Sequence, residues 1–152
     1  MKFSFEDMEV GTSREIGKHT FTREEIVGFA QKFDPQPFHL DEAAGAESPF
    51  RGLVASGWHT CSVMMGMLVR NLLADSTSMG SPGVDEIRWL KPVRVGDTIT
   101  MMNVVVDKRV SQSKPDRGIV STRWEGINQH GETVITVNSK GMFGLREPGV
   151  AA

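Results

Sequence analysis

The apolar positions that follow residue 21 predict a first helix. Residues at the i, i+3, i+4, i+7 spacing of one helix face are apolar, namely Ile26, Phe29, Ala30 and Phe33. Thr22 is a suitable N-cap residue, and Glu25 stands three positions later, at the spacing of a capping box. Asp34 precedes a proline, and such a residue avoids the α region, so the helix should end there. The segment from Asp34 to His39 is therefore expected to form a loop fixed at the end of a rigid helix.

A second helix is predicted to begin near Ser56 and Gly57 and to end at about Ala74. Its apolar residues cover most of the circumference and are Trp58, Cys61, Val63, Met64, Met65, Met67, Leu68, Val69 and Leu72. A helix that is apolar on nearly every side is normally buried, so we expect this one inside the fold. The methionines within it could line a tunnel for a flexible acyl chain, although filling the core is the simpler role.

The rest of the chain has the pattern of strands. Segments rich in β-branched and aromatic residues extend over residues 84–90, 98–110, 119–128 and 133–143, and shorter ones over 3–5 and 16–21. The order is short strands, two helices and then a run of long antiparallel strands. This order predicts an α+β fold in which a sheet covers a buried helix, as a single domain over residues 1–152.

Composition narrows the class of protein. Of the 152 residues, 39% are hydrophobic and 24% are charged, and the net charge of −2 gives no reason to expect nucleic acid as a partner. The first eight residues lack the apolar core of a secretory signal, and the most apolar segment, residues 61–69, is too short to span a bilayer. The lone cysteine, Cys61, fits a reducing compartment and the role of a packed core thiol. We therefore expect a cytoplasmic protein with no membrane partner.

Asp34 and His39 are the first candidates for chemistry. A carboxylate and an imidazole five positions apart could hold one water molecule and move its proton. Histidine suits this work because its unperturbed pKa is ~6.5. The simpler interpretation is an aspartate that ends a helix and a surface histidine in a proline turn. The pair is favoured as a site because a rigid helix precedes it and a helix led by glycine follows it.

Gly57 is the second candidate. The N–H groups at a helix start are free and lie at the positive end of the helix dipole, so they can stabilise a developing oxyanion. Glycine also lets a substrate approach the backbone closely. The alternatives are a glycine cap or a tight contact between helix and strand. Ser56 is expected to be the N-cap, because no nucleophile motif surrounds it. Together these groups suit the addition of water to a thioester-activated chain, or its removal.

Three segments of the chain resemble, in the same order, the motifs of a known protein family. Residues 34–39 read Asp-Pro-Gln-Pro-Phe-His, residues 55–58 read Ala-Ser-Gly-Trp, and residues 91–97 read Lys-Pro-Val-Arg-Val-Gly-Asp. These resemble the Asp-x-Asn-Pro-x-His motif, the Val-His-Gly-Met turn and the Pro-Val-x-x-Gly-Asp turn of the MaoC-like, or (R)-specific enoyl-CoA hydratase, family of the hot-dog superfamily. Gln36 stands where the family has Asn, and Ser56 where it has His. The likeness extends over roughly residues 5–143.

The resemblance implies a curved antiparallel sheet wrapped around a central helix, in a homodimer or a dimer of dimers. It implies Asp34 and His39 as the catalytic pair and Gly57 as the oxyanion-hole residue. An acyl-CoA thioester is then the substrate, with no separate cofactor and no metal. The side chains expected to contact the substrate adjoin these motifs and are Gln36, Phe38, Ser56 and Trp58.

Alternatives remain open for the activity and for some residues. Thioester hydrolysis, or acyl-CoA binding without turnover, would use the same fold. Three basic residues lie on the expected strand over residues 84–90 and on the turn that follows it, namely Arg88, Lys91 and Arg94. They would either contact the phosphates of CoA or form a solvated strand edge. A metal site of His39, Asp41 and His59 is conceivable but has no standard ligand spacing, and a structural role is the simpler interpretation of His59.

Overall fold

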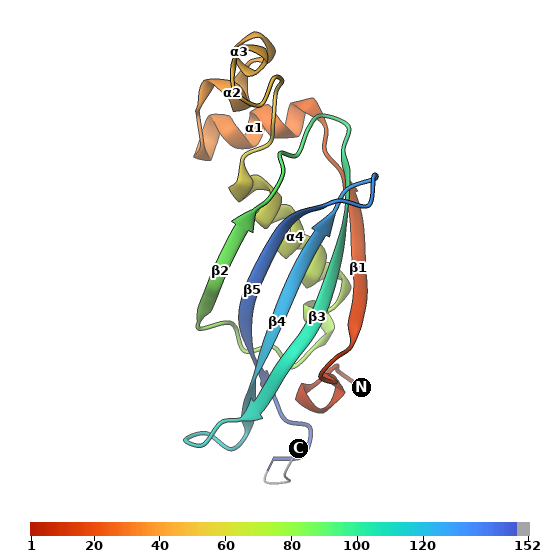
Figure 1. Ribbon diagram of the computed structural model, residues 1–152. Coiled ribbons are helices and arrows are strands. Elements are labelled where there is room, and N and C mark those ends of the chain that lie inside the picture. Colours follow the sequence, from red (N-terminus) through yellow and green to blue (C-terminus); the bar gives the residue numbers. More distant parts are fainter. Residues whose placement is uncertain (149–152) are drawn as a thin grey trace.

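The computed structural model describes residues 1–148 and shows a five-stranded antiparallel sheet beside one long helix (Figure 1). The expected domain over residues 1–152 includes residues 149–152, which lie outside the described range. The strands are β1 (Ser13–Thr20), β2 (Gly83–Trp89), β3 (Thr98–Val110), β4 (Arg117–Ile127) and β5 (Thr133–Gly144). They pair in the order β1-β3-β4-β5-β2, so β1 and β2 form the two edges. The predicted α+β fold class is confirmed.

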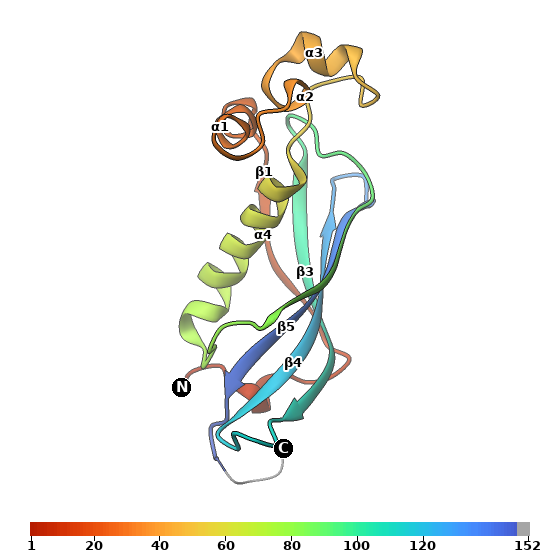
Figure 2. The same cartoon turned by 90° about the vertical axis from the view of Figure 1, so that its left-hand side faces the viewer.

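The long helix α4 (Gly57–Asn71) packs along one face of the sheet (Figure 2). The alternating burial along β3 shows which of its residues face α4: Ile99, Met101, Asn103 and Val105 are buried, and their neighbours are less so. Met64 and Met67 of α4 are buried in the same core. The register of the strands shifts at several places, for example between Val105 and Asp107, and such bulges help a sheet to bend around a helix.

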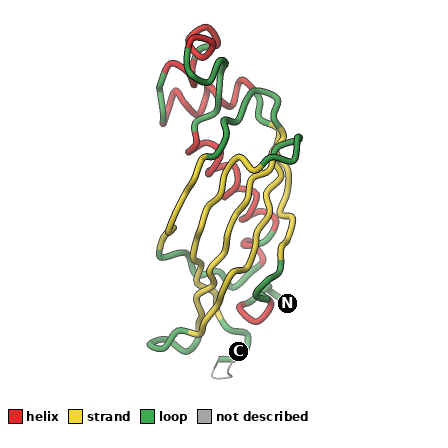
Figure 3. The backbone as a smooth tube through the Cα atoms, viewed as in Figure 1, coloured by secondary structure: helices red, strands yellow, loops and turns green. Residues whose placement is uncertain are grey.

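Three shorter helices lie at the end of the molecule where α4 begins (Figures 1 and 3). They are α1 (Arg23–Phe33), α2 (Pro37–Leu40) and α3 (Glu42–Glu47). The helix α1 begins after Thr22, whose hydroxyl accepts a hydrogen bond from the Glu25 N–H at 3.3 Å. The end of α1 at Asp34 and the start of α4 lie at the same end of the sheet (Figure 1). None of the helices within residues 1–148 has both the length and the apolar character needed to cross a membrane.

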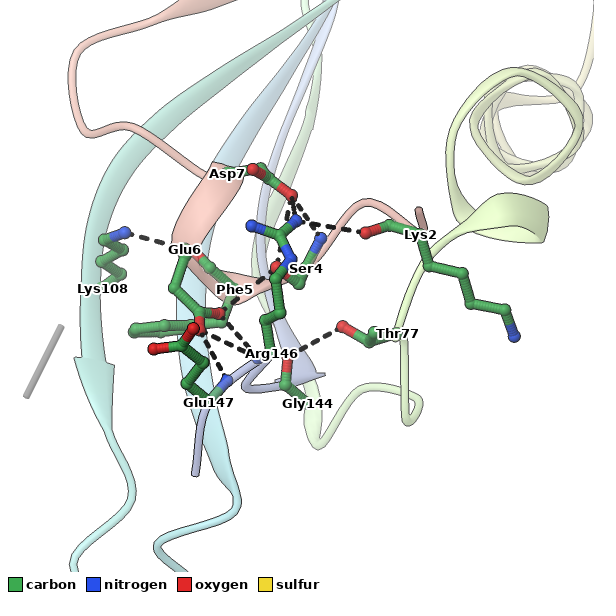
Figure 4. Close-up of polar contacts among 10 residues, drawn as sticks. All are labelled: Lys2, Ser4, Phe5, Glu6, Asp7, Thr77, Lys108, Gly144, Arg146 and Glu147. Atoms are coloured by element: carbon green, nitrogen blue, oxygen red, sulfur yellow. Dashed lines mark hydrogen bonds and ion pairs between the residues drawn. The ribbon is translucent and has the colours of Figure 1, made fainter. Parts of the chain in front are cut away.

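The described ends of the chain meet at the opposite end of the sheet. The short 3-10 helix η1 (Phe5–Asp7) contacts the segment that follows β5 (Figure 4). The Arg146 N–H donates to the Glu6 carboxylate at 2.9 Å, and the Arg146 guanidinium forms an ion pair with Asp7. Lys108 of β3 donates to the Phe5 carbonyl at 3.2 Å. These contacts fix the N-terminal segment to the sheet, far from the end where α1 and α2 lie.

Several sequence expectations need correction. The helix α4 is not buried on every side, because Trp58, Met65 and Val69 are exposed. It also ends at Asn71, and a separate 3-10 helix, η2 (Leu73–Asp75), follows it. Phe33 was expected on the apolar face of α1, yet it is 70% exposed.

Two expectations about short segments were also wrong. Residues 3–5 form no strand: Phe3 makes one isolated bridge with Ser76, and η1 begins at Phe5. The expected loop from Asp34 to His39 is partly helical, because α2 contains His39. Pro37 starts this helix at a position where proline is well tolerated, since its missing N–H would have no helical partner there.

Candidate active site

Asp34 and His39 face each other between two short elements. Asp34 ends α1, where its N–H donates to the Ala30 carbonyl at 2.9 Å, and His39 lies in the single turn of α2. The Asp34 Oδ2 and His39 Nε2 atoms are 3.3 Å apart, and the two side chains are 17% and 7% exposed. The two residues therefore form a close carboxylate–imidazole pair that is largely shielded from solvent.

Hydrogen bonds hold the Asp34 carboxylate in a fixed orientation. The Ser56 hydroxyl donates to Oδ2 at 2.7 Å, and the Gln36 amide donates to Oδ1 at 2.7 Å. Partial burial acts to raise the pKa of Asp34. The hydrogen bonds from Gln36 and Ser56, followed by the charge of His39, outweigh this effect and hold the pKa below its usual value. Asp34 is thus kept as a carboxylate well into the acidic range.

The His39 ring is oriented by a backbone carbonyl. Its Nδ1 atom lies 2.6 Å from the Val54 oxygen, and a carbonyl can only accept, so Nδ1 must carry a proton. In the neutral ring Nε2 is then left unprotonated, and this is the atom that faces Asp34. The ring can therefore exchange a proton only through Nε2, beside the Asp34 carboxylate. Sequence reasoning missed Val54, because no side chain marks a backbone acceptor.

Gly57 is the first residue of α4, and both its N–H group and its lack of a side chain matter to the site. The Ser56 hydroxyl caps the helix by accepting from the Trp58 N–H at 3.2 Å, and the Ser56 carbonyl accepts from His59 and Thr60. Within residues 1–148 the Gly57 N–H has no hydrogen-bond acceptor. A Cβ atom at Gly57 would lie 2.3 Å from the Trp89 indole nitrogen. The tight helix–strand contact weighed from the sequence is therefore real, and it coexists with a free N–H.

These groups line a common cleft of about 440 Å³. Predicted site residues contribute to it from the end of α1 to the start of α4, and they are Asp34, Gln36, Phe38, His39, Gly57 and Trp58. Ser56 does not line it directly but contacts it through its hydrogen bond to Asp34. Apolar residues that sequence reasoning missed also line the cleft, namely Phe50, Val54, Trp89, Val134 and Ile135. Most of these come from the sheet, whose position relative to α2 no local pattern reveals.

Aromatic side chains shape the cleft around the pair. The Phe38 ring meets the His39 ring edge-on, with centroids 4.6 Å apart. Trp58 and Trp89 form a second edge-on contact at 5.2 Å, and each is about half exposed. The cleft thus has an aromatic wall beside His39 and a more exposed aromatic pair at the start of α4.

Other candidates are only partly brought to this cleft. Of the basic residues weighed as CoA contacts, only Lys91 lines it, where it also pairs with Glu132. Arg94 donates to the Phe50 carbonyl at 2.6 Å, and Arg88 pairs with Glu86. The role of these residues toward CoA stays a prediction.

The alternative metal site is not assembled. Asp41 caps α3 by accepting from the Ala44 N–H at 2.9 Å, whereas the His59 ring stacks on Phe29 with centroids 4.9 Å apart. Among residues 1–148, no group of three or more His, Cys, Asp or Glu side chains is placed to hold a metal ion. Cys61 is half-buried, and burial raises the pKa of its thiol, as expected for a packing residue rather than a nucleophile.

Comparison with known proteins finds dehydratases and a hydratase among the similar proteins. A MaoC-like dehydratase from Rhodospirillum rubrum is 38% identical and superimposes with a TM-score of 0.89, over 95% of this chain and 99% of that one. The 3-hydroxybutyryl-CoA dehydratase of Methylorubrum extorquens is 27% identical over 141 residues, which are 90% of this chain and 85% of the relative. An (R)-hydratase from A. caviae involved in PHA biosynthesis is 26% identical, with a TM-score of 0.68 over 88% of this chain and 95% of the other.

The family model agrees with these relatives. The model described as a MaoC-like domain matches residues 6–125, a segment that contains α1, α2 and α4 with the candidate site between them. The sheet and its long helix are likewise shared with structures of hot-dog proteins. The resemblance expected from the sequence is confirmed: the chain belongs to the MaoC-like domain family and has the hot-dog fold.

Proposed function

We propose that the protein reversibly adds water to a trans-2-enoyl thioester and forms an (R)-3-hydroxyacyl thioester. The observation that carries this proposal is the approach of Asp34 Oδ2 to His39 Nε2, at 3.3 Å, in a cleft that also contains the free Gly57 N–H. Hydration needs a base for water, a proton for the α-carbon and a donor for the thioester oxygen. The cleft offers one group for each of these tasks.

The Gly57 N–H is the proposed donor to the thioester oxygen. Negative charge develops on that oxygen when hydroxide adds to the β-carbon. The N-terminus of α4 carries a partial positive charge, and the absence of a side chain on Gly57 allows close approach. A preorganised donor of this type lowers a barrier by roughly 3–4 kcal/mol in other enzymes.

Asp34 and His39 are proposed to share the water. The unprotonated Nε2 of His39 accepts one proton from it, while Asp34 Oδ2 accepts a hydrogen bond from its other O–H group. The water oxygen bonds to the β-carbon, the C=C electrons move toward the thioester carbonyl, and the proton on Nε2 then passes to the α-carbon. The enzyme returns to its starting state, and no redox cofactor is needed.

The relatives support the substrate class that we propose, and exposed apolar residues of this chain support the proposed assembly. A 3-hydroxybutyryl-CoA dehydratase and an (R)-hydratase are among the similar proteins, so a CoA thioester is the proposed substrate. Exposed apolar residues along α4 and the edge strand β2 suit a homodimer that covers them, and they include Trp58, Met65, Val69, Val84 and Trp89.

Turnover of crotonyl-CoA and of longer trans-2-enoyl-CoA esters tests the function. We expect loss of the enoyl absorbance without release of free thiol, and an (R)-3-hydroxyacyl product on chiral analysis. Asp34→Asn should fold normally but lose activity by roughly 10²–10⁴-fold, the usual contribution of acid–base catalysis. Thiol release in place of hydration would instead assign a thioesterase, and tight binding of the esters without turnover would assign an acyl-CoA-binding protein.

A further inference from the structure

The Trp89 indole lies against the residue that carries the proposed oxyanion donor. Trp89 is the last residue of β2, and this strand ends beside the start of α4 (Figure 1). A Cβ atom added to Gly57 would lie 2.3 Å from Nε1, 2.4 Å from Cε2 and 2.8 Å from Cδ1 of Trp89. Because a carbon–carbon bond is about 1.5 Å long, the nearest ring atom lies within about 4 Å of the Gly57 Cα, which is van der Waals contact. The five-membered ring of the indole therefore covers the side of Gly57 that faces β2.

The sheet holds Trp89 in place. Its backbone pairs with Ile135 of β5, and the N–H of the next residue, Leu90, donates to the Val134 carbonyl at 2.8 Å. Ile135 is fully buried, so the end of β2 is anchored to the core. The indole also meets the Trp58 ring edge-on, with centroids 5.2 Å apart and an angle of 76° between the rings. This edge-on contact and the pairing of β2 with β5 together restrict where the indole can lie.

Other contacts fix the start of α4 on different sides. The Ala55 N–H donates to the Val93 carbonyl at 2.8 Å, which holds the chain just before the helix. The Ser56 hydroxyl donates to the Asp34 carboxylate at 2.7 Å, which holds the N-cap toward α1. Gly57 itself has no side chain with which to pack. The indole thus supplies the contact of this residue on the side of β2.

Trp89 also acts on the next turn of α4. Cys61 lies four residues after Gly57, and residues at this spacing share one face of a helix. Burial raises the pKa of the Cys61 thiol, and a hydrogen bond from the Trp89 side chain acts in the opposite direction. Because the indole reaches both residues, it can fix the direction of the first turn as well as its distance from the sheet.

We propose that Trp89 is a positioning residue for the reaction: its indole sets the place of the first turn of α4, and so the direction of the Gly57 N–H toward the thioester oxygen. This inference rests on the proposed hydratase function. A donor in an oxyanion hole acts at about 2.7–3.1 Å from the charged oxygen, and a misplacement of about 1 Å can cost roughly 10²-fold in rate. Because the charge on that oxygen is largest in the transition state, a displaced donor lowers kcat more than it raises KM.

Kinetics with crotonyl-CoA test the inference. Trp89→Leu removes the flat ring from Gly57, so kcat should fall by roughly 10–10²-fold while KM changes by less than about threefold. Trp89→Phe keeps a flat ring but lacks the indole N–H, and it should retain kcat within about threefold. An unchanged kcat in Trp89→Leu, or a loss that falls mainly on KM, would overturn the inference. Equal losses in both variants would assign the effect to the indole N–H and would also overturn it.

Ile87→Ala is the matched control for these variants. Ile87 lies two residues before Trp89 on β2, so it shares the same face of the strand, and it lines the groove beside α4. This variant loses packing between β2 and α4 without changing the contact with Gly57. Its Tm should fall, whereas kcat and KM should stay unchanged. A loss of kcat equal to that of Trp89→Leu would make the effect of Trp89 one of general packing.

A double variant tests whether Trp89 acts through Gly57. In the native background, Gly57→Ala forces a Cβ atom against the indole. In the Trp89→Leu background, the added methyl group meets a smaller and more flexible side chain. Gly57→Ala should then lower kcat by no more than about a further threefold, because residues in contact do not act additively. Losses that simply multiply would show that the two residues act independently, contrary to the proposed role.

Infrared spectroscopy separates this inference from the proposed reaction. Butyryl-CoA, isotope-labelled at its carbonyl carbon, is saturated and needs no turnover. A hydrogen bond from Gly57 should lower the stretching frequency of the bound thioester carbonyl. Trp89→Phe and Ile87→Ala should keep this shift and Trp89→Leu should lose most of it, which would support the positioning role even if no enoyl-CoA is hydrated. Hydration of crotonyl-CoA with the native shift and the native kcat in Trp89→Leu would overturn the inference and leave the hydratase function standing.

Discussion

Two carboxylate–imidazole contacts lie near the start of α4, and they differ in their surroundings. Asp34 and His39 are 3.3 Å apart and line a cleft of about 440 Å³. Glu25 lies 2.6 Å from His19 and 3.8 Å from His59, and none of these three residues lines that cleft. The chemical groups are the same in both places. Access to a substrate-sized space distinguishes the first contact as the candidate for catalysis.

The surroundings of the second contact are aromatic. The His59 ring stacks on Phe29 and meets Phe21 edge-on at 5.1 Å, and its Nδ1 atom is buried without a hydrogen-bond partner within residues 1–148. Burial lowers the pKa of His59; the charge of Glu25 acts in the opposite direction, and that of His19 adds to the lowering. This contact fixes α1 and β1 against α4, as expected of structural residues. The sequence-based interpretation of His59 as structural agrees with this packing.

The largest expected difference between the two contacts appears when one histidine of each is replaced by glutamine. His39→Gln should lower kcat/KM for crotonyl-CoA by roughly 10²–10⁴-fold, because it removes the group that takes up the proton. His59→Gln should retain most of the activity at temperatures where it stays folded, although its Tm should fall. Steady-state kinetics and thermal unfolding of both variants measure this difference. Equal losses of activity would show that the two contacts form one functional unit.

A smaller effect is expected when a glycine near each contact is replaced by alanine, which adds one methyl group. Gly57→Ala places a Cβ against the Trp89 indole and displaces the start of α4, so kcat should fall by roughly 10²-fold, as when an oxyanion donor is lost. Gly28→Ala is the control on α1, where a Cβ meets no atom within 4 Å. It should stabilise the helix by about 0.5–1 kcal/mol and leave kcat unchanged. An unchanged kcat in Gly57→Ala would remove Gly57 from the proposed mechanism.

The sequence predicted those parts of the fold that depend on local signals. The N-cap at Thr22 and the proline after Asp34 fixed the two ends of α1, and the β-branched pattern located β3 at its observed bounds. Local signals failed where a side chain has a distant partner. Glu25 has the spacing of a capping box, but its carboxylate contacts His19 of β1 instead of closing the box.

The candidate site was predictable in its side chains and not in its geometry. The resemblance to the family marked Asp34, His39 and Gly57, and the structure places all three in one cleft. It did not reveal that Val54 orients His39 or that Trp89 covers Gly57. The first contact joins α2 to the segment before α4, and the second joins β2 to the start of α4, so neither has a local sequence signal. The helix α2 was missed because a single turn is too short to show an apolar period.

A subtler variant probes why Asp34 remains ionised. Ser56→Ala removes one of the hydrogen bonds that lower the pKa of Asp34, so that pKa should rise. Because the proposed mechanism needs the carboxylate, the acidic limb of the kcat/KM profile should move to higher pH. The lost N-cap should also cost about 1 kcal/mol of stability.

Ser62→Ala is the matched control for that profile. Ser62 is exposed on the same helix, and its hydroxyl donates to the Trp58 carbonyl at 2.8 Å, away from Asp34. Its pH profile should superimpose on that of the native protein. If the acidic limb of Ser56→Ala also stays in place, a group other than Asp34 determines it.

The smallest expected effect concerns stability at the second contact. His59 has a lowered pKa when folded, so the unfolded chain, with a histidine pKa of ~6.5, binds the proton more readily. The free energy of unfolding should therefore fall as the pH drops through ~6.5 toward the folded pKa, by up to about 1.4 kcal/mol per pH unit for one proton. His59→Phe should remove this part of the slope in denaturant unfolding at graded pH. The matched change His130→Phe, in an exposed turn, should leave it in place. A slope that persists unchanged in His59→Phe would mean that another titrating group produces it, and the lowered pKa of His59 would then no longer distinguish the buried structural contact from the catalytic one.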